Sequence, residues 1–97
     1  MPDPTSQDEL LCCIRRSLTL GRARLTTHFR IRLAERGAGM QDVLRAVNKG
    51  GITEVHWEET RSSWRCTVQG TDFEGDELRI VCAVQEFEEL VTLITLC

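Results

Sequence analysis

The sequence predicts an α+β fold, with helices in its first half and an antiparallel sheet of about four strands in its second half. Up to Asn48 the apolar residues recur at helical spacing, and from Ile52 onward they alternate with polar residues as in a strand. The chain has 97 residues, 41% of them hydrophobic, which is enough for one hydrophobic core and too little for two. We therefore expect a single domain over residues 8–97, preceded by a disordered polar segment, Met1–Gln7.

Three helices are expected in the first half. Apolar side chains at helical spacing predict the first helix over Asp8–Leu20. The second helix is expected to begin after Thr26 or Thr27, either of which caps it with a side-chain oxygen, and to end at Gly37. The third is expected over Met40–Asn48, with an acidic residue in its first turn that the helix dipole favours.

Four strands are expected in the second half: Ile52–Glu59, Ser63–Gln69, Leu78–Gln85 and Leu90–Leu96. The first three alternate between apolar and polar residues. The fourth is mostly apolar, which indicates a central strand or one covered on both faces. Because the gaps between the strands are short, a meander joined by hairpins is the simplest sheet.

The cysteines and histidines give no sign of a metal site or a cofactor. The chain contains no Cys-x-x-Cys motif, and its histidines, His28 and His56, lie at no metal-ligand spacing from any cysteine. No apolar run approaches the roughly 20 residues of a membrane span, and no signal-type segment is visible. We therefore expect a cytoplasmic protein with reduced cysteines and no membrane partner.

Charge is distributed unevenly along the chain. Residues 1–49 carry nine basic and five acidic groups, a net charge of +4, whereas residues 50–97 carry three basic and ten acidic groups, a net charge of −7. The basic half could bind phosphate while the acidic half repels it, which would orient a nucleic acid. Alternatively, the two halves simply attract each other across the fold.

The second helix carries the main candidate site. His28, Arg32 and Arg36 recur every four residues and fall within an arc of about 80° on one helix face, with apolar residues on both flanks. The flanks predict that these polar groups are partly buried. The helix N-terminus favours a neutral His28 imidazole that can act as a base, and the two guanidinium groups suit a phosphate. The competing interpretation is a solvated face whose arginines pair with Glu35 and the acidic sheet.

Two weaker signals lie in the second half. The carboxylates of Asp72–Glu77 alternate as in a calcium loop, but the twelve-residue frame is missing, so a solvated hairpin turn is expected. Arg65, Thr67 and Arg79 lie at polar positions of the strands and are candidates for binding the phosphates of a substrate.

The order of the motifs resembles a bacterial family, domain of unknown function 4258. The similar features are His28-x3-Arg32-x3-Arg36-Gly, a glycine-bearing helix end, and the final strand Val91–Thr95, within a similarity that runs from about Leu10 to Cys97. The resemblance implies the fold of RelE-type toxins and small ribonucleases, in which N-terminal helices pack on a twisted antiparallel sheet. It also implies that His28, Arg32, Arg36 and Thr95 are the functional polar positions.

Two functions follow as hypotheses. The first is a toxin-like, metal-independent endoribonuclease or RNA-binding protein, with His28 as the base, Arg32 and Arg36 as phosphate ligands, and Thr95 as a further site residue. The second is a non-catalytic protein-interaction module of a toxin–antitoxin-like system, which binds a cognate protein through its acidic half. The first requires the His28 face to be open to solvent, whereas the second allows a carboxylate to cover it.

Overall fold

The computed structural model describes residues 6–85 and 90–97. In this part of the chain it contains three α-helices, one short 3-10 helix and five strands. In chain order they are α1 (Gln7–Thr19), β1 (Arg24–Leu25), α2 (Thr27–Arg36), α3 (Met40–Lys49), β2 (Gly51–Glu58), η1 (Glu59–Arg61), β3 (Ser63–Thr71), β4 (Glu77–Gln85) and β5 (Leu90–Leu96).

Local capping sets the helix ends, which lie within one residue of the predicted positions. The Ser6 hydroxyl accepts a hydrogen bond from the N–H of Glu9, so α1 begins at Gln7, inside the segment expected to be disordered. Residues 1–5 of that segment lie outside the described residues. Thr26 caps α2 in the same way, and Gly37, at φ 67°, ends it in the left-handed conformation that glycine tolerates best.

The sheet differs from the prediction in two respects. Its order is β1-β5-β4-β3-β2, which makes five strands rather than four, and β1 pairs with β5 in parallel, so the sheet is mixed rather than purely antiparallel. The remaining four strands form the expected antiparallel meander. A strand of two residues, Arg24–Leu25, is too short to give an alternating pattern, and its partner lies far along the chain.

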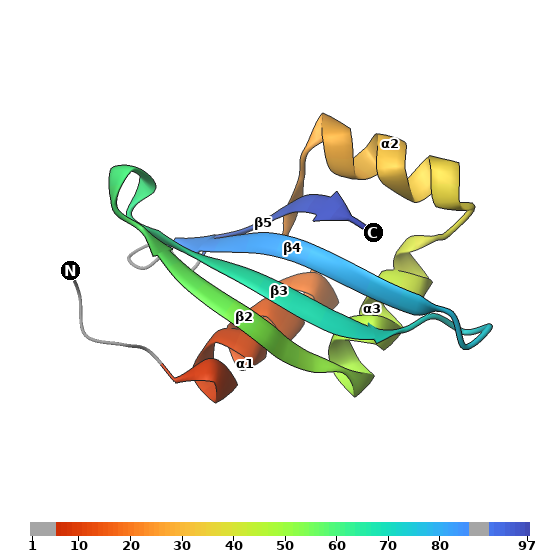
Figure 1. The fold of residues 1–97 in the computed structure, drawn as a ribbon, viewed down its shortest axis with the longest axis horizontal. Helices are drawn as coiled ribbons and strands as arrows, with labels where there is room; N and C mark the ends of the chain where they lie inside the picture. Colours follow the sequence, from red (N-terminus) through yellow and green to blue (C-terminus); the bar gives the residue numbers. More distant parts are fainter. Residues whose placement is uncertain (1–5, 86–89) are drawn as a thin grey trace.

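The helices cover one face of the sheet. Figure 1 shows α1 and α3 behind the sheet, while α2 lies beyond β5 at its edge. Alternate residues of β3 and β4, among them Cys66, Val68, Ile80 and Cys82, are fully buried on this covered face, where they join α1 and α3 in one core. We call the opposite face, which carries Arg65 and the other alternate residues, the open face, because no helix of the described chain lies over it.

β5 is an interior strand, as predicted, between β4 and β1. The segment Asp72–Glu77 forms the β3–β4 hairpin turn, since the Asp72 carboxylate accepts hydrogen bonds from the N–H groups of Glu74 and Asp76. No group of three or more potential metal ligands occurs in residues 6–85 and 90–97. None of the helices described is long and apolar enough to cross a membrane.

Candidate functional site

Helix α2 is fixed along the edge of β5. The backbone N–H of Thr26 donates to the Leu93 carbonyl (3.1 Å), and its hydroxyl donates to the Ile94 carbonyl (2.8 Å). The same hydroxyl oxygen accepts the N–H of Phe29 (3.0 Å). Thr26 therefore both starts the helix and joins its first turn to the last strand, which aligns the rest of α2 with the end of β5.

Arg32 and Arg36 bond to backbone carbonyls at the ends of two strands. Arg32 Nε donates to the Leu96 carbonyl of β5 at 3.0 Å. Arg36 Nη2 donates to the Glu77 carbonyl at the start of β4. The backbone N–H and carbonyl of Arg79 both form hydrogen bonds with Cys97, just beyond the end of β5. Residues two apart in a strand direct their backbone groups to the same side, so the Glu77 carbonyl also points toward the position that a longer β5 would occupy. Arg36 thus provides the donor that a longer β5 would provide.

This arrangement differs from the expected pairing of the arginines with Glu35 and the acidic sheet, whereas phosphate binding by the arginines stays a prediction. Within residues 6–85 and 90–97, the partners of the two guanidinium groups are carbonyl oxygens rather than Glu35 or another carboxylate. Arg32 is half-buried, as predicted, whereas His28 and Arg36 are exposed, which differs from the prediction. The reason is that one predicted apolar flank faces solvent, with Ile31 53% exposed.

The order of side chains around α2 places His28 next to Arg32, away from the buried Phe29. A helix turns by 100° per residue, so the side chains follow one another around the helix axis in a fixed order. Starting from Phe29 and going in one direction, the order is Arg36, Arg32, His28 and then Glu35. Phe29 is fully buried in the core, and the two arginines contact the strand ends. The next position around the helix is that of His28, which is exposed.

Three other candidate residues share the open face. Thr95 of β5 lies opposite Val81, and Arg79 lies two residues before Val81 on the same side of β4. Arg65 of β3 lies opposite Ala83, the next residue on that side. The structure thus brings Thr95, Arg79 and Arg65 onto one surface, with α2 along its β5 edge (Figure 1).

The cations of this face have carboxylate neighbours. Arg65 pairs with Glu58 at 3.3 Å, and Arg79 pairs with Glu77 at 3.7 Å. Gln69 donates a 2.6 Å hydrogen bond to the same Glu77 carboxylate. Because these pairs are partly or largely exposed to water, each is worth about 0–1 kcal/mol, and a stronger anion could displace the carboxylates.

Two polar neighbours of these arginines were not among the site residues predicted from the sequence. Gln69 lies opposite Arg79, and His56 lies opposite Arg65, where it pairs with Glu54 at 3.5 Å. Gln69 and His56 fall at polar positions of the alternating sequence of their strands. The alternation within one strand does not give the register that sets these residues beside the arginines, because register depends on pairing between strands.

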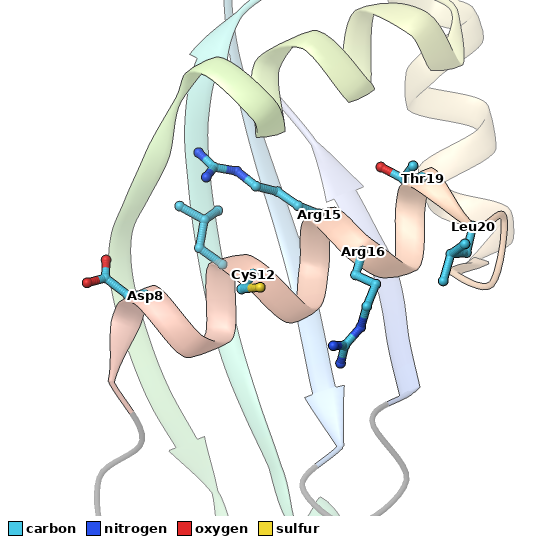
Figure 2. A pocket seen from close by; sticks show the side chains of 7 residues that line it. Asp8, Cys12, Arg15, Arg16, Thr19 and Leu20 are labelled. Atoms are coloured by element: carbon cyan, nitrogen blue, oxygen red, sulfur yellow. The ribbon is translucent and has the colours of Figure 1, made fainter.

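A separate groove runs along the outer side of α1 (Figure 2). It has a volume of about 700 Å³, and its lining residues are Asp8, Leu11, Cys12, Arg15, Arg16, Thr19 and Leu20. Arg15 turns toward α3, where it donates to the carbonyls of Val47 and Gly50. None of the residues predicted as site residues lines this groove, and its lining has no histidine to serve as a base.

Comparisons with known proteins support the family resemblance. No curated protein and no solved structure matches the chain. The family described as a domain of unknown function, DUF4258, matches residues 25–97, so the matched range begins later than the expected Leu10 and leaves α1 outside it. The matched range includes α2 and the whole antiparallel meander. On this match, the chain belongs to the DUF4258 family.

Proposed function

We propose that this protein is a toxin-like, metal-independent endoribonuclease that binds RNA on the open face of a RelE-like fold. The proposal rests on two observations: the exposed His28 on α2, the helix beside β5, and the shared face of Thr95, Arg79 and Arg65 on the sheet. The proposal places the protein in the cytoplasm, where its five free cysteines stay reduced.

In the proposed reaction, His28 accepts the proton of an RNA 2′-hydroxyl. The 2′ oxygen then bonds to the adjacent phosphorus, and the bond from phosphorus to the 5′ oxygen breaks. The products are a 2′,3′-cyclic phosphate and a 5′-hydroxyl that takes its proton from water. Arg79 and Arg65 bind phosphates of the bound strand, and Thr95 lies between them and α2.

Arg32 contributes from the edge of this surface. Its bond to the Leu96 carbonyl uses one of its several N–H donors and fixes the position of the guanidinium group. The remaining donors stabilise the extra negative charge on the pentacoordinate phosphorus. Arg36, whose bond to the Glu77 carbonyl holds the end of α2, acts on the site chiefly by keeping the helix in place.

The test compares the two histidines of the chain. Purified protein, His28→Ala and His56→Ala are incubated with structured RNA in EDTA, and both cleavage and end-group chemistry are measured. His56 is the matched control, since it is an exposed histidine on β2 paired with Glu54. We expect the parent and His56→Ala to produce cyclic phosphate ends and a folded His28→Ala to produce none. Equal cleavage by all three proteins, or no cleavage by the parent, would contradict the proposal.

A second candidate function is a non-catalytic interaction module of a toxin–antitoxin-like system. The supporting observation is that the cations of the open face already have internal partners, with Arg65 paired to Glu58 and Arg79 to Glu77. A labelled oligoribonucleotide separates the two candidates in a binding titration at low and high salt. Phosphate binding requires an affinity that falls steeply as salt rises, whereas an interaction module gives no binding at either salt concentration.

A further inference from the structure

The two-residue strand β1 adds an arginine to the open face beyond those predicted from the sequence. Arg24 lies opposite Thr92 in the parallel pair of β1 and β5, and the next residue, Leu25, lies opposite the fully buried Leu93. Opposed residues in a sheet point to the same side, and successive residues in a strand point to opposite sides. Leu25, which packs against the core, therefore lies on the covered face, and Arg24 lies on the open face.

Four residues form a row across the open face, one from each of four neighbouring strands. Thr92 of β5 lies opposite Ala83 of β4, and Ala83 lies opposite Arg65 of β3. We call Arg24, Thr92, Ala83 and Arg65 the Arg24 row. Neighbouring strands are about 4.8 Å apart, so the backbone positions of its two arginines are about 14 Å apart. The row thus has a cation at each end and two small, uncharged, half-buried side chains between them.

The two arginines of the row have different surroundings. Arg24 is exposed and forms no ion pair with a carboxylate among residues 6–85 and 90–97. Arg65 pairs with Glu58 of β2, a strand that lies on the far side of β3 from β1. The Arg65 guanidinium group is therefore drawn away from Arg24. A single phosphate does not bridge the two groups, whereas two phosphates of one nucleic acid chain do.

The charge of the open face changes across the sheet. β2 contributes two carboxylates to this face, those of Glu54 and Glu58. In the described parts of β1, β4 and β5, the one carboxylate on this face is that of Glu77, six positions before Ala83 along β4. A polyanion is therefore repelled at the β2 edge and attracted toward Arg24 at the β1 side of the sheet.

We infer that an RNA chain crosses the sheet along the Arg24 row, with one backbone phosphate on Arg24 and another on Arg65. The inference rests on the proposed function and names its class of substrate, which is a chain of several nucleotides held through its phosphates rather than a mononucleotide. The small side chains of Thr92 and Ala83 leave room for the chain between the two phosphates. Binding through phosphates makes the contact independent of base sequence.

Arg24 also joins the row to the helix that carries the proposed base. Only two residues separate Arg24 from Thr27, where α2 begins. His28 is the second residue of that helix, four positions after Arg24. A phosphate bound by Arg24 therefore holds the chain at the strand that leads directly into α2.

The test measures binding separately from cleavage. A fluorescent oligoribonucleotide with a methoxy group in place of every 2′-hydroxyl keeps its phosphates but lacks the nucleophile of the proposed reaction. It is titrated at several salt concentrations with the full chain, Arg24→Ala and Lys49→Ala. Lys49→Ala is the matched control, because it removes one positive charge from α3, which lies behind the sheet (Figure 1).

We expect Arg24→Ala to weaken binding about tenfold at low salt and to reduce the slope of log affinity against log salt by about 1. Lys49→Ala should leave the slope unchanged. Arg24→Lys, which keeps the charge, should recover most of the affinity, and the double variant Arg24→Ala, Arg65→Ala should reduce the slope by about 2. A mononucleotide should not displace the oligonucleotide at comparable nucleotide concentration.

The outcomes separate this inference from the proposed function. If folded Arg24→Ala and Lys49→Ala bind the oligonucleotide equally well, the row is refuted, while cleavage of unmodified RNA that depends on His28 still supports the ribonuclease. Binding that depends on Arg24 without any cleavage supports the row and refutes the ribonuclease. Displacement by a mononucleotide refutes the substrate class, and a parent protein that does not bind the oligonucleotide refutes both.

Discussion

Arg32 Nε donates a 3.0 Å hydrogen bond to the carbonyl oxygen of Leu96, 64 positions later in the chain. Arg32→Ala leaves that half-buried carbonyl without its donor. We expect the free energy of unfolding to fall by about 2 kcal/mol, as for other hydrogen bonds from a charged group. Urea unfolding measures the loss, and the exposed Arg30→Ala on the same helix serves as the control. Equal stability of the two variants would show that the bond contributes nothing.

Gly70 allows β3 to approach the backbone of α3. A Cβ atom at this position would lie 2.2 Å from the carbonyl oxygen of Ala46, and neither backbone can move without disturbing the helix or the sheet. We expect Gly70→Ala to destabilise the protein by about 3 kcal/mol or more. Gly51→Ala is the matched control, because no heavy atom lies within 4 Å of its added Cβ. In thermal unfolding, Gly70→Ala should have a clearly lower melting temperature than Gly51→Ala. Similar melting temperatures would contradict the close approach of β3 to α3.

Asp42 makes the stability depend on pH. Hydrogen bonds from the N–H groups of Gly39 and Phe73 lower the pKa of Asp42 below its ordinary value of 3.8. A carboxylate with a lowered folded-state pKa contributes stability that is complete above the unfolded pKa and is lost as pH falls toward the folded value. We therefore expect the melting temperature to decrease below about pH 5. Asp42→Asn should flatten this decrease, whereas Glu35→Gln, which removes an exposed negative charge elsewhere, should not.

Four of the five cysteines should react in two groups. Burial raises the pKa of Cys66 to about 12, and it raises that of Cys82 as well, so both remain protonated and covered in the native protein. Cys12 and Cys97 are exposed. With iodoacetamide at pH 8, mass spectrometry should find Cys12 and Cys97 modified first, and Cys66 and Cys82 modified only after unfolding. Rapid labelling of Cys66 in folded protein would contradict the burial of β3 against the helices.

Sequence alone predicts the helices and four of the strands well because their signals are local. Thr26 caps α2 through a residue three positions later, and Gly37 ends it through its own backbone conformation. Strands β2, β3 and β4 alternate over eight or nine residues, enough for a clear period of two. The two-residue β1 has no such local signal, because it is defined by its pairing with β5, in which Leu25 lies opposite the distant Leu93.

The candidate site is less predictable for a related reason. The four-residue spacing of His28, Arg32 and Arg36 correctly places all three on α2, but it cannot reveal what they contact. The carbonyls that bind the arginines belong to Leu96 and Glu77, which are backbone groups with no sequence signature. Which face of the sheet His28 borders likewise depends on how α2 is fixed to β5.

The two edges of the sheet resist self-association by different means. At the β2 edge, the register shift between Ile52 and Glu54 interrupts the ladder, and charged side chains discourage an incoming strand. At the other edge, β1 pairs with only two residues of β5, and beyond them the side chains of Thr26 and Arg32 donate to the carbonyls of Ile94 and Leu96. Detachment of α2 would therefore expose a template for intermolecular β-pairing, so a weakened helix contact leads to aggregation as well as to lower stability.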